Sequence, residues 1–280
     1  MSIIIGIDVG GSTTKIVGLE KNGDLKLKSP MFISATDPVS SLFGAFGKYL
    51  YSNQIELKDV DKVMITGVGT TQVEGGIYGL PTFKVDEFAA DALGAHYGSD
   101  LKKMIVVSMG TGTSLVKYDN GKISHIGGVS IGGGTITGLS SLILHTNDIL
   151  KVCEMAQDGD SNNVNLLIGD ICKRHLEGLP AFATASLFGK VKHEAVNQSD
   201  VAAGIIYLVV ETIGSCAVLA GLNTDIKDYV FIGNIAKLPT VRSVFDLMER
   251  IYGVRFHIPE NAEFRTALGA AISGLDKAVE

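Results

Sequence analysis

Three glycine-rich turns, each beside a stretch that predicts a β-strand, constrain the fold more than any other feature of the sequence. They lie at residues 10–12, 110–112 and 132–134. Glycine lets a backbone turn tightly or approach a ligand closely, and main-chain N–H groups at such turns bind anions. A single turn of this kind is a weak signal. Three of them in strand contexts predict a nucleotide phosphate held between two lobes.

The order of strands and turns occurs twice along the chain. In each copy, a strand leads into a glycine-rich turn, a second strand follows, and an Asn-Gly turn connects it to a third. The predicted strands are residues 2–9, 14–19 and 25–28 in the first copy, and 104–109, 114–118 and 122–126 in the second. Two α/β lobes with a cleft between them would place both glycine turns against one ligand.

The remaining elements complete an α/β pattern. Beyond the repeated strands, hydrophobic spacing predicts helices at 39–51, 86–97 and 263–275, and strands at 60–66, 229–232 and 254–257. We expect one lobe from residues 1–100 and a second from residues 101–280. The C-terminal helix, at about 263–276, is expected to pack back on the first lobe.

Charge and apolar content exclude several classes of partner. A net charge of −6 argues against a general affinity for nucleic acid or for an anionic membrane surface. The stretch 201–222 is long and apolar enough to cross a bilayer, but Glu211 lies in its middle, so a buried helix fits better. Residues 3–7 follow the N-terminus without a basic leader, so no signal peptide is expected.

The cysteines predict no metal centre and no disulfide framework. Cys153, Cys172 and Cys216 are far apart in the sequence, and no Cys-x-x-Cys motif is present. Three separate thiols are typical of a protein in the reducing cytoplasm.

The first turn combines groups that suit a phosphate. Asp8 ends the first strand and could hold a hydrated Mg²⁺, while Gly10 and Gly11 let the backbone approach the phosphates. Ser12 adds a hydroxyl, and Lys15 offers a point charge to a transferring phosphoryl group. The same residues also fit an ordinary hairpin with a solvated lysine.

The second and third turns repeat this chemistry without charges. Residues 110–112 are followed by the hydroxyls of Thr113 and Ser114, although a simple turn between strands has the same composition. Three glycines at 132–134 indicate either a flexible loop or a backbone that must meet a ligand. Because Thr135 opens a predicted helix, the second option also predicts an anion site at a helix N-terminus.

Two further side chains are candidates for chemistry. Glu87 could take the proton of an acceptor hydroxyl. The alternative is that Asp86 caps the helix and Glu87 only complements the helix dipole. His125 could contact an acidic substrate, or it could be a structural histidine at a strand end.

These segments resemble type II pantothenate kinases, including the eukaryotic enzymes. The similarity runs in order through nearly the whole chain, and the long glycine-rich segment is its most specific part. The matching segments are Asp8–Ser12 with Lys15, Gly110–Ser114, Gly127–Leu139, Thr184–Lys190, Phe231–Asn234 and Phe264–Ala270.

The resemblance implies a two-lobed actin-like ATPase fold of the ribonuclease H-like α/β kind, with a central mixed sheet in each lobe and a nucleotide cleft between them. It also implies a cytoplasmic homodimer that uses ATP and Mg²⁺. The implied reaction is phosphorylation of the primary hydroxyl of pantothenate to 4′-phosphopantothenate, the first step of coenzyme A biosynthesis.

The resemblance also assigns roles to individual residues. It makes Glu87 the catalytic base and Asp8 the Mg²⁺ ligand, directly or through water. The residues that it places around the nucleotide are Asp8, Gly10, Gly11, Ser12, Lys15, Gly110, Thr111, Gly112, Gly132, Gly133, Gly134, Thr135, Gly233 and Asn234. Those that it places at the substrate are Thr113, Ser114 and His125.

One departure from the family concerns the acceptor. The family often has an arginine that grips the pantothenate carboxylate where this chain has His125. A histidine is a weaker, titratable partner for a carboxylate. The identity of the acceptor therefore stays open, and another small hydroxyl-bearing metabolite is an alternative substrate.

Two alternatives to a kinase follow from the same residues. Gly6–Lys15 also resembles ATP-dependent activators of 2-hydroxyacyl-CoA dehydratases, which carry an iron–sulfur cluster on closely placed cysteines across a dimer. The isolated thiols of this chain speak against that interpretation. A nucleotide sensor that keeps the cleft but has lost phosphoryl transfer would also preserve the glycine turns.

Overall fold

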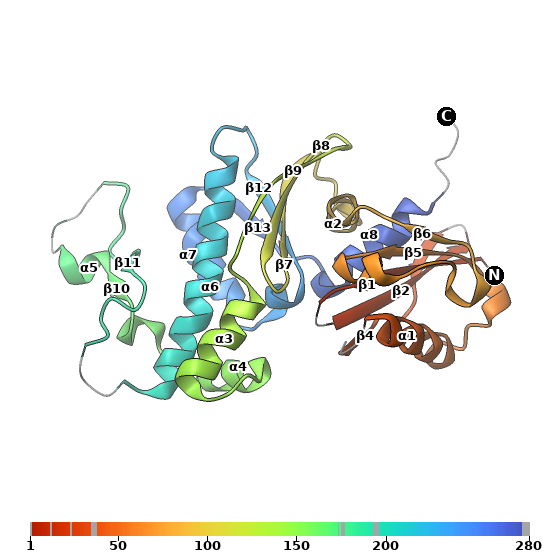
Figure 1. Cartoon of the computed structure of the whole chain (residues 1–280). Helices are drawn as coiled ribbons and strands as arrows, with labels where there is room; N and C mark the ends of the chain where they lie inside the picture. The colour runs from red at the N-terminus through yellow and green to blue at the C-terminus, as the bar shows by residue number, and fades with distance from the viewer. Residues whose placement is uncertain are drawn as a thin grey trace.

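Two mixed β-sheets lie side by side, with helices packed around and between them (Figure 1). The computed structural model describes residues 2–11, 13–22, 24–34, 38–172, 174, 177–192 and 196–275. The first sheet has the strand order β3-β2-β1-β5-β6, with β4 also on β2, and the second has the order β13-β12-β7-β8-β9. In both, an antiparallel meander continues into parallel strands. The predicted duplication is therefore confirmed at the level of topology.

The first sheet is centred on a strand that is buried along its whole length. β1 (Ile3–Val9) pairs antiparallel with β2 (Thr13–Asn22) and parallel with β5 (Val60–Thr66). A continuous Ile/Val run of this kind suits a strand covered on both faces. The outer strands are β3 (Asp24–Leu27), β4 (Met31–Ser34) and β6 (Thr82–Lys84).

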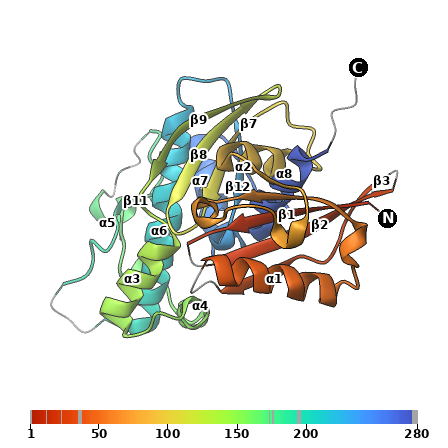
Figure 2. The same cartoon turned by 45° about the vertical axis from the view of Figure 1, so that its right-hand side comes forward.

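Two helices cover this sheet, one on each face. α1 (Pro38–Ser52) packs Leu42, Phe46 and Tyr49 against one face. α8 (Arg265–Ser273) packs its alanines and Leu268 against the other face. The C-terminal helix is thus next to the N-terminal strands, and Figure 2 shows α1 and α8 on opposite sides of β1 and β2.

The second sheet carries the larger core. Its strands are β7 (Lys103–Met109), β8 (Thr113–Asp119), β9 (Lys122–Val129), β12 (Asp228–Ile232) and β13 (Arg255–His257). One face is covered by α6 (Gln198–Gly221) and α7 (Val241–Tyr252), with α3 (Gly133–Leu144) and α4 (Ile149–Gln157) beside α6. The other face packs on α2 (Glu87–His96).

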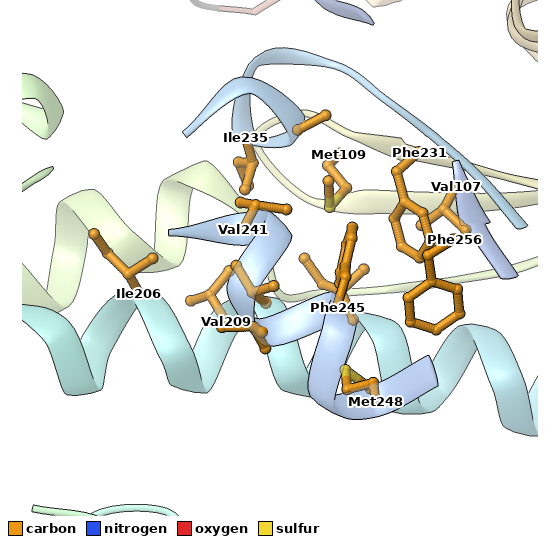
Figure 3. Packing of buried hydrophobic residues seen from close by; sticks show 14 of the residues in the cluster. Val107, Met109, Ile206, Val209, Phe231, Ile235, Val241, Phe245, Met248 and Phe256 are labelled. Atoms are coloured by element: carbon orange, nitrogen blue, oxygen red, sulfur yellow. The ribbon is translucent and has the colours of Figure 1, made fainter. Parts of the chain in front are cut away.

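Aromatic rings join the second sheet to its helices (Figure 3). The ring centroid of Phe231 on β12 lies 4.2 Å from that of Phe245 on α7 and 4.9 Å from that of Phe256 on β13. Val209 and Ile206 of α6 approach from below in that view. This packing gives the second lobe a rigid base for the strand ends that carry the turns.

Short elements complete the chain. A two-stranded sheet of β10 (Leu166–Leu167) and β11 (Thr184–Ser186), with α5 (Ile168–Ile171), lies beyond α6 (Figure 1). The 3₁₀ helices are η1 (Leu57–Asp59), η2 (Val68–Gln72), η3 (Ile77–Gly79), η4 (Ser161–Asn163), η5 (Asn234–Lys237) and η6 (Ala262–Phe264).

The predicted strands and long helices are present, with differences at their ends. Sequence patterns missed β4, β6, β10 and β11, because two to four residues are too few to show alternation. The C-terminal α-helix begins at Arg265, after η6. Residue 276 of the expected range lies outside the described residues. Gly23 of the first Asn-Gly turn also lies outside them. The predicted boundary at residue 100 falls between α2 and β7 and stays a prediction.

The apolar stretch that raised the question of a membrane forms most of α6. Among the described residues, Gln198–Gly221 is one helix with the length and composition of a membrane span, and 67% of its most apolar window is buried inside the structure. Its apolar residues pack against the second sheet and against α4 and α7. The helix thus has the surroundings of a core helix.

Candidate active site

The first glycine turn presents a buried ion pair at the end of two strands. Asp8 and Lys15 face each other across the β1–β2 ladder. Their side chains are almost fully buried, and Lys15 Nζ lies 3.3 Å from Asp8 Oδ2. The amide of Gly10 donates to Thr13 O and closes the turn, which leaves Gly11 exposed. Ser12, also predicted to belong to this site, lies outside the described residues.

A further glycine turn, missed in the sequence, supports this pair. Gly67 follows β5 and has a φ of +92°, and a Cβ there would lie 2.6 Å from Val9 O and 2.8 Å from Asp8 Oδ1. A larger residue at this position would displace Asp8. The signal that could have found it is the Gly-x-Gly that follows a predicted strand, as at the other turns.

The start of α2 is fixed to the end of the first sheet. Val85 N donates to Ile65 O, and Thr66 Oγ1 donates to Val85 O at 3.0 Å. Asp86 then caps the helix by accepting from Ala89 N at 2.9 Å. The capping role considered for Asp86 is therefore confirmed. Glu87 does not share that role, and within the described part of the chain its carboxyl accepts no hydrogen bond.

Glu87 lies close enough to the ion pair for the charges to interact. Burial raises the pKa of its carboxyl, and the negative charges of Asp8 and Asp86 raise the pKa further, while Lys15 lowers it. A half-buried carboxylate without a hydrogen-bond partner and with a raised pKa is a competent proton acceptor.

The second glycine turn keeps backbone donors open. Gly110 N donates to Gly112 O, whereas the exposed amides of Thr111 and Gly112 donate no hydrogen bond to any residue that the structure describes. Thr113 is buried, and its hydroxyl donates to Ile131 O at 2.8 Å. In this structure Thr113 therefore has a structural contact, while the two open amides are free to meet an anion.

The glycine run packs directly on this second turn. Gly133 N donates to Gly110 O at 2.8 Å, and Gly134 N donates to Thr111 O at 3.0 Å. Gly132 N donates to Thr135 Oγ1. A Cβ at Gly132 would lie 2.5 Å from Thr111 O. The amides expected to bind an anion at this helix start are thus used to join α3 to the second turn, and the glycines permit the close approach.

The last predicted glycine completes the same cluster. Gly233 follows β12 with a φ of +96°, and a Cβ there would overlap Met109 O at the end of β7. Its amide donates to Ala262 O at 2.9 Å. The neighbouring Asn234 is exposed. Gly233 thus occupies the place in the second sheet that Gly67 occupies in the first.

Asp91 is a buried carboxyl that the sequence analysis missed. It accepts from Thr266 Oγ1 at 2.7 Å and from Ser114 Oγ at 3.3 Å. Complete burial raises its pKa to about 7, against the opposing effect of the Thr266 hydrogen bond. Its spacing of four residues from Glu87, within an alanine-rich helix, is the signal that could have found it.

His125 lies beside the start of α2. Its exposed ring on β9 stacks on the ring of Phe88, with centroids 4.0 Å apart and planes at 13°. Phe88 directly follows Glu87 in the helix. The ring of this histidine therefore contacts the residue that directly follows the candidate base in α2.

The site fits a magnesium ion that arrives with a nucleotide. No group of three or more His, Cys, Asp or Glu side chains within the described ranges could hold a metal on its own. Mg²⁺ in phosphoryl-transfer sites uses one or two carboxylates together with phosphate oxygens and water. Asp8, a single carboxylate at an open glycine turn, matches that arrangement.

Solved structures with the same fold bind adenine nucleotide analogues. The activator of the 2-hydroxyisocaproyl-CoA dehydratase from Clostridium difficile, with bound ADPNP, matches 97% of this chain and 93% of its own at a TM-score of 0.69 and 17% identity. A ROK family glucokinase from Streptomyces griseus, in complex with glucose and AMPPNP, matches 97% and 98% at 0.58 and 12%. The two-lobed actin-like fold predicted from the sequence is confirmed.

Comparison with related sequences identifies the family within this fold. A type II pantothenate kinase from Staphylococcus aureus (strain MRSA252) is 29% identical over 279 residues, which cover 96% of this chain and 99% of the relative. The Fumble family model matches residues 81–245, from the strand that precedes α2 to the middle of α7. That is more than half of the 280 residues, and the chain belongs to the Fumble family.

Proposed function

We propose that the protein is an ATP-dependent kinase that phosphorylates the primary hydroxyl of pantothenate. The observation that carries the proposal is the carboxyl of Glu87, which accepts no hydrogen bond from the described residues and lies beside the buried Asp8–Lys15 pair. The pantothenate kinase relative, aligned over 96% of the chain, supplies the substrate class.

The two glycine turns would hold the triphosphate from opposite sides. Lys15 offers its ammonium to the terminal phosphates from the first lobe, and the open amides of Thr111 and Gly112 face the anion from the second. Asp8 would hold Mg²⁺, directly or through water, and the bound ion would neutralise charge on the phosphate oxygens. Gly10, Gly11 and Asn234 would form the surrounding surface, and the buried Gly233 would position Asn234.

Glu87 would act as the general base. Its carboxylate accepts the proton of the pantothenate hydroxyl as that oxygen attacks the γ-phosphorus. The new O–P bond forms while the bond from the γ-phosphorus to the bridging oxygen of ADP breaks, and ADP leaves with the electron pair. A raised pKa makes Glu87 a stronger base than an ordinary surface carboxylate.

His125 would meet the carboxylate of the acceptor. The imidazole stacks on Phe88 at the rim of the site and is exposed, so one ring nitrogen can face a bound anion. A ring nitrogen that carries a proton can donate a hydrogen bond to that carboxylate.

The proposed function also suggests where the enzyme is located, how it assembles and how the chain divides into lobes. We place the enzyme in the cytoplasm as a homodimer, with lobes at residues 1–100 and 101–280. The alternative of a dehydratase activator has the fold in its favour, but the identity to that structure is only 17%. Cys153 is buried in α4, Cys172 follows α5, and Cys216 belongs to α6, so the three thiols lie on separate elements.

A direct assay tests the proposal. Purified protein with Mg-ATP and pantothenate should form equal amounts of ADP and 4′-phosphopantothenate, measured by mass spectrometry. Glu87→Gln should keep ADPNP binding, measured by calorimetry, and lose most of the product. Unchanged pantothenate, together with consumption of another small alcohol or sugar, would show that the acceptor is assigned wrongly.

A further inference from the structure

A single buried carboxyl on α2 touches both lobes. Asp91 follows Glu87 by one helical turn, and it is fully buried. We propose that Asp91 is a positioning residue, which ties α2 to α8 and to β8 and thereby fixes Glu87 relative to the second glycine turn. The inference rests on the proposed function, because it concerns the same base and the same turn.

On the first-lobe side, Asp91 lies where two helix backbones meet. A Cβ at Gly94 would overlap Arg265 O, and a Cβ at Gly269 would overlap Ala90 O. Beside this crossing, Thr266 Oγ1 donates to Asp91 Oδ1 at 2.7 Å. The small residues allow the close approach, but they do not fix the rotation of α2 about its axis. A directional hydrogen bond from α8 does fix it.

On the second-lobe side, Asp91 holds the strand that leaves the second turn. Ser114 Oγ donates to Asp91 Oδ2 at 3.3 Å, and Ser114 follows residues 110–112 by two positions. Ser108, paired with Ser114 across the β7–β8 ladder, interacts with the same carboxyl. Both ends of the hairpin that carries the open amides of Thr111 and Gly112 are therefore connected to α2.

The helix transmits this constraint to the base. Residues four apart lie on one face of a helix, so Glu87 and Asp91 point toward the same side of α2. A rotation of α2 that breaks the Asp91 contacts would also move the Glu87 carboxyl. A displacement of about 1 Å in a reacting group can lower the rate by about 100-fold.

Burial alone would favour a small apolar side chain at position 91 of α2. Ala90 and Ala92, the neighbours of Asp91, are buried without any polar group. Burying a carboxyl is costly unless its partners are well placed. The hydrogen bonds from Thr266 on α8 and Ser114 on β8 compensate for part of that cost here.

The test compares removal of the carboxyl with its closest isostere. Asp91→Ala should lower kcat for ADP formation about 10- to 100-fold, and the KM for ATP should stay within about threefold. Asp91→Asn should recover most of kcat, because the amide oxygen can accept from Thr266 and the amide nitrogen can donate to Ser114. Val244→Ala, on the buried face of α7, controls for general destabilisation and should lower Tm without changing kcat.

A second readout does not depend on the identity of the substrate. Hydrogen exchange should become faster in Asp91→Ala at residues 90–94 of α2 and at residues 113–116 of β8 together, because both segments are hydrogen-bonded in the wild type, and Asp91→Asn should retain the protection of both. If the wild type leaves pantothenate unphosphorylated while Asp91→Ala shows this exchange pattern, the proposed function is wrong and the positioning role still holds. The role is overturned if Asp91→Ala behaves like Val244→Ala, or if Asp91→Asn fails to recover kcat and protection.

Discussion

The two lobes carry the same hairpin with different chemistry. In the first, the strand pair that leads into the glycine turn holds Asp8 opposite Lys15. In the second, the corresponding pair is Ser108 opposite Ser114. The helix α2 lies near both hairpins: the Glu87 carboxyl interacts with the charged pair, and the Asp91 carboxyl accepts a hydrogen bond from Ser114 of the hydroxyl pair.

Because of this difference, the two hairpins suit different tasks although they share one backbone topology. Buried charges at the first hairpin suit a transferring phosphoryl group, because they interact strongly in a site shielded from water. Hydroxyls at the second hairpin satisfy a buried carboxyl without adding net charge. The second hairpin is also braced by the glycine run, which donates to Gly110 O and Thr111 O, so its geometry depends on packing more than on charge.

The largest expected effect concerns the carboxyl beside the charged hairpin. Glu87→Gln should lower kcat by about 10²- to 10⁴-fold, because the amide cannot accept the proton of the acceptor. Steady-state ADP formation measures the loss. Asp86→Asn is the matched control, because asparagine also caps helices well and should leave kcat within a few-fold. Equal losses in the two variants would argue against a special role for Glu87.

Equivalent positions in the two hairpins should differ in stability. Lys15→Met leaves Asp8 as a buried charge without its partner and should cost about 3 kcal/mol or more in the free energy of unfolding. Ser114→Ala removes one long hydrogen bond and should cost about 1 kcal/mol. Urea denaturation measures both. Similar costs would mean that the charged pair is more hydrated than its burial indicates.

A glycine that packs on the second hairpin should also respond differently from a glycine within the first. Gly132→Ala places a Cβ against Thr111 O and should cost about 1–3 kcal/mol, with weaker ADPNP binding. At Gly11 an added Cβ meets no atom of the described residues within 4 Å, so Gly11→Ala should change stability by less than about 0.5 kcal/mol. Thermal unfolding with and without ADPNP separates the two outcomes.

The smallest expected effect is a pH dependence at Asp91. The pKa of its carboxyl is about 7 in the folded protein and near 3.8 when unfolded, so the folded state binds more protons between these values. The wild type should therefore lose stability relative to Asp91→Asn as the pH rises, by about 1 kcal/mol between pH 5 and pH 6. Denaturation at both pH values measures the difference, and an opposite trend would indicate an ionised Asp91 with well-placed donors.

Local patterns were sufficient for the turns and for most strands. Asp8, Lys15 and the glycines at 110–112 were predicted from strand-turn-strand spacing, and the structure brings them to corresponding strand ends. Asp91 could not be predicted as a link between lobes, because its partner Thr266 is 175 positions away in the sequence.

The glycine run shows the same limit. Its composition predicted either a flexible loop or a backbone that meets a ligand, and only tertiary packing decides that its amides meet Gly110 and Thr111. Gly67 could have been predicted, since it repeats Gly233 at the end of the corresponding strand and differs from it in φ by only a few degrees, +92° against +96°.

The contact between α2 and α8 limits how the molecule can change shape. With glycine on both helices at the crossing, main chain lies against main chain, and Arg265 on α8 donates to the carbonyl oxygens of Gly94 and Tyr97. Sliding one helix along the other would require both backbones to separate first. If the two sheets move relative to each other while this contact is kept, the axis of that movement lies near α2, and the side chains of α2 are displaced least.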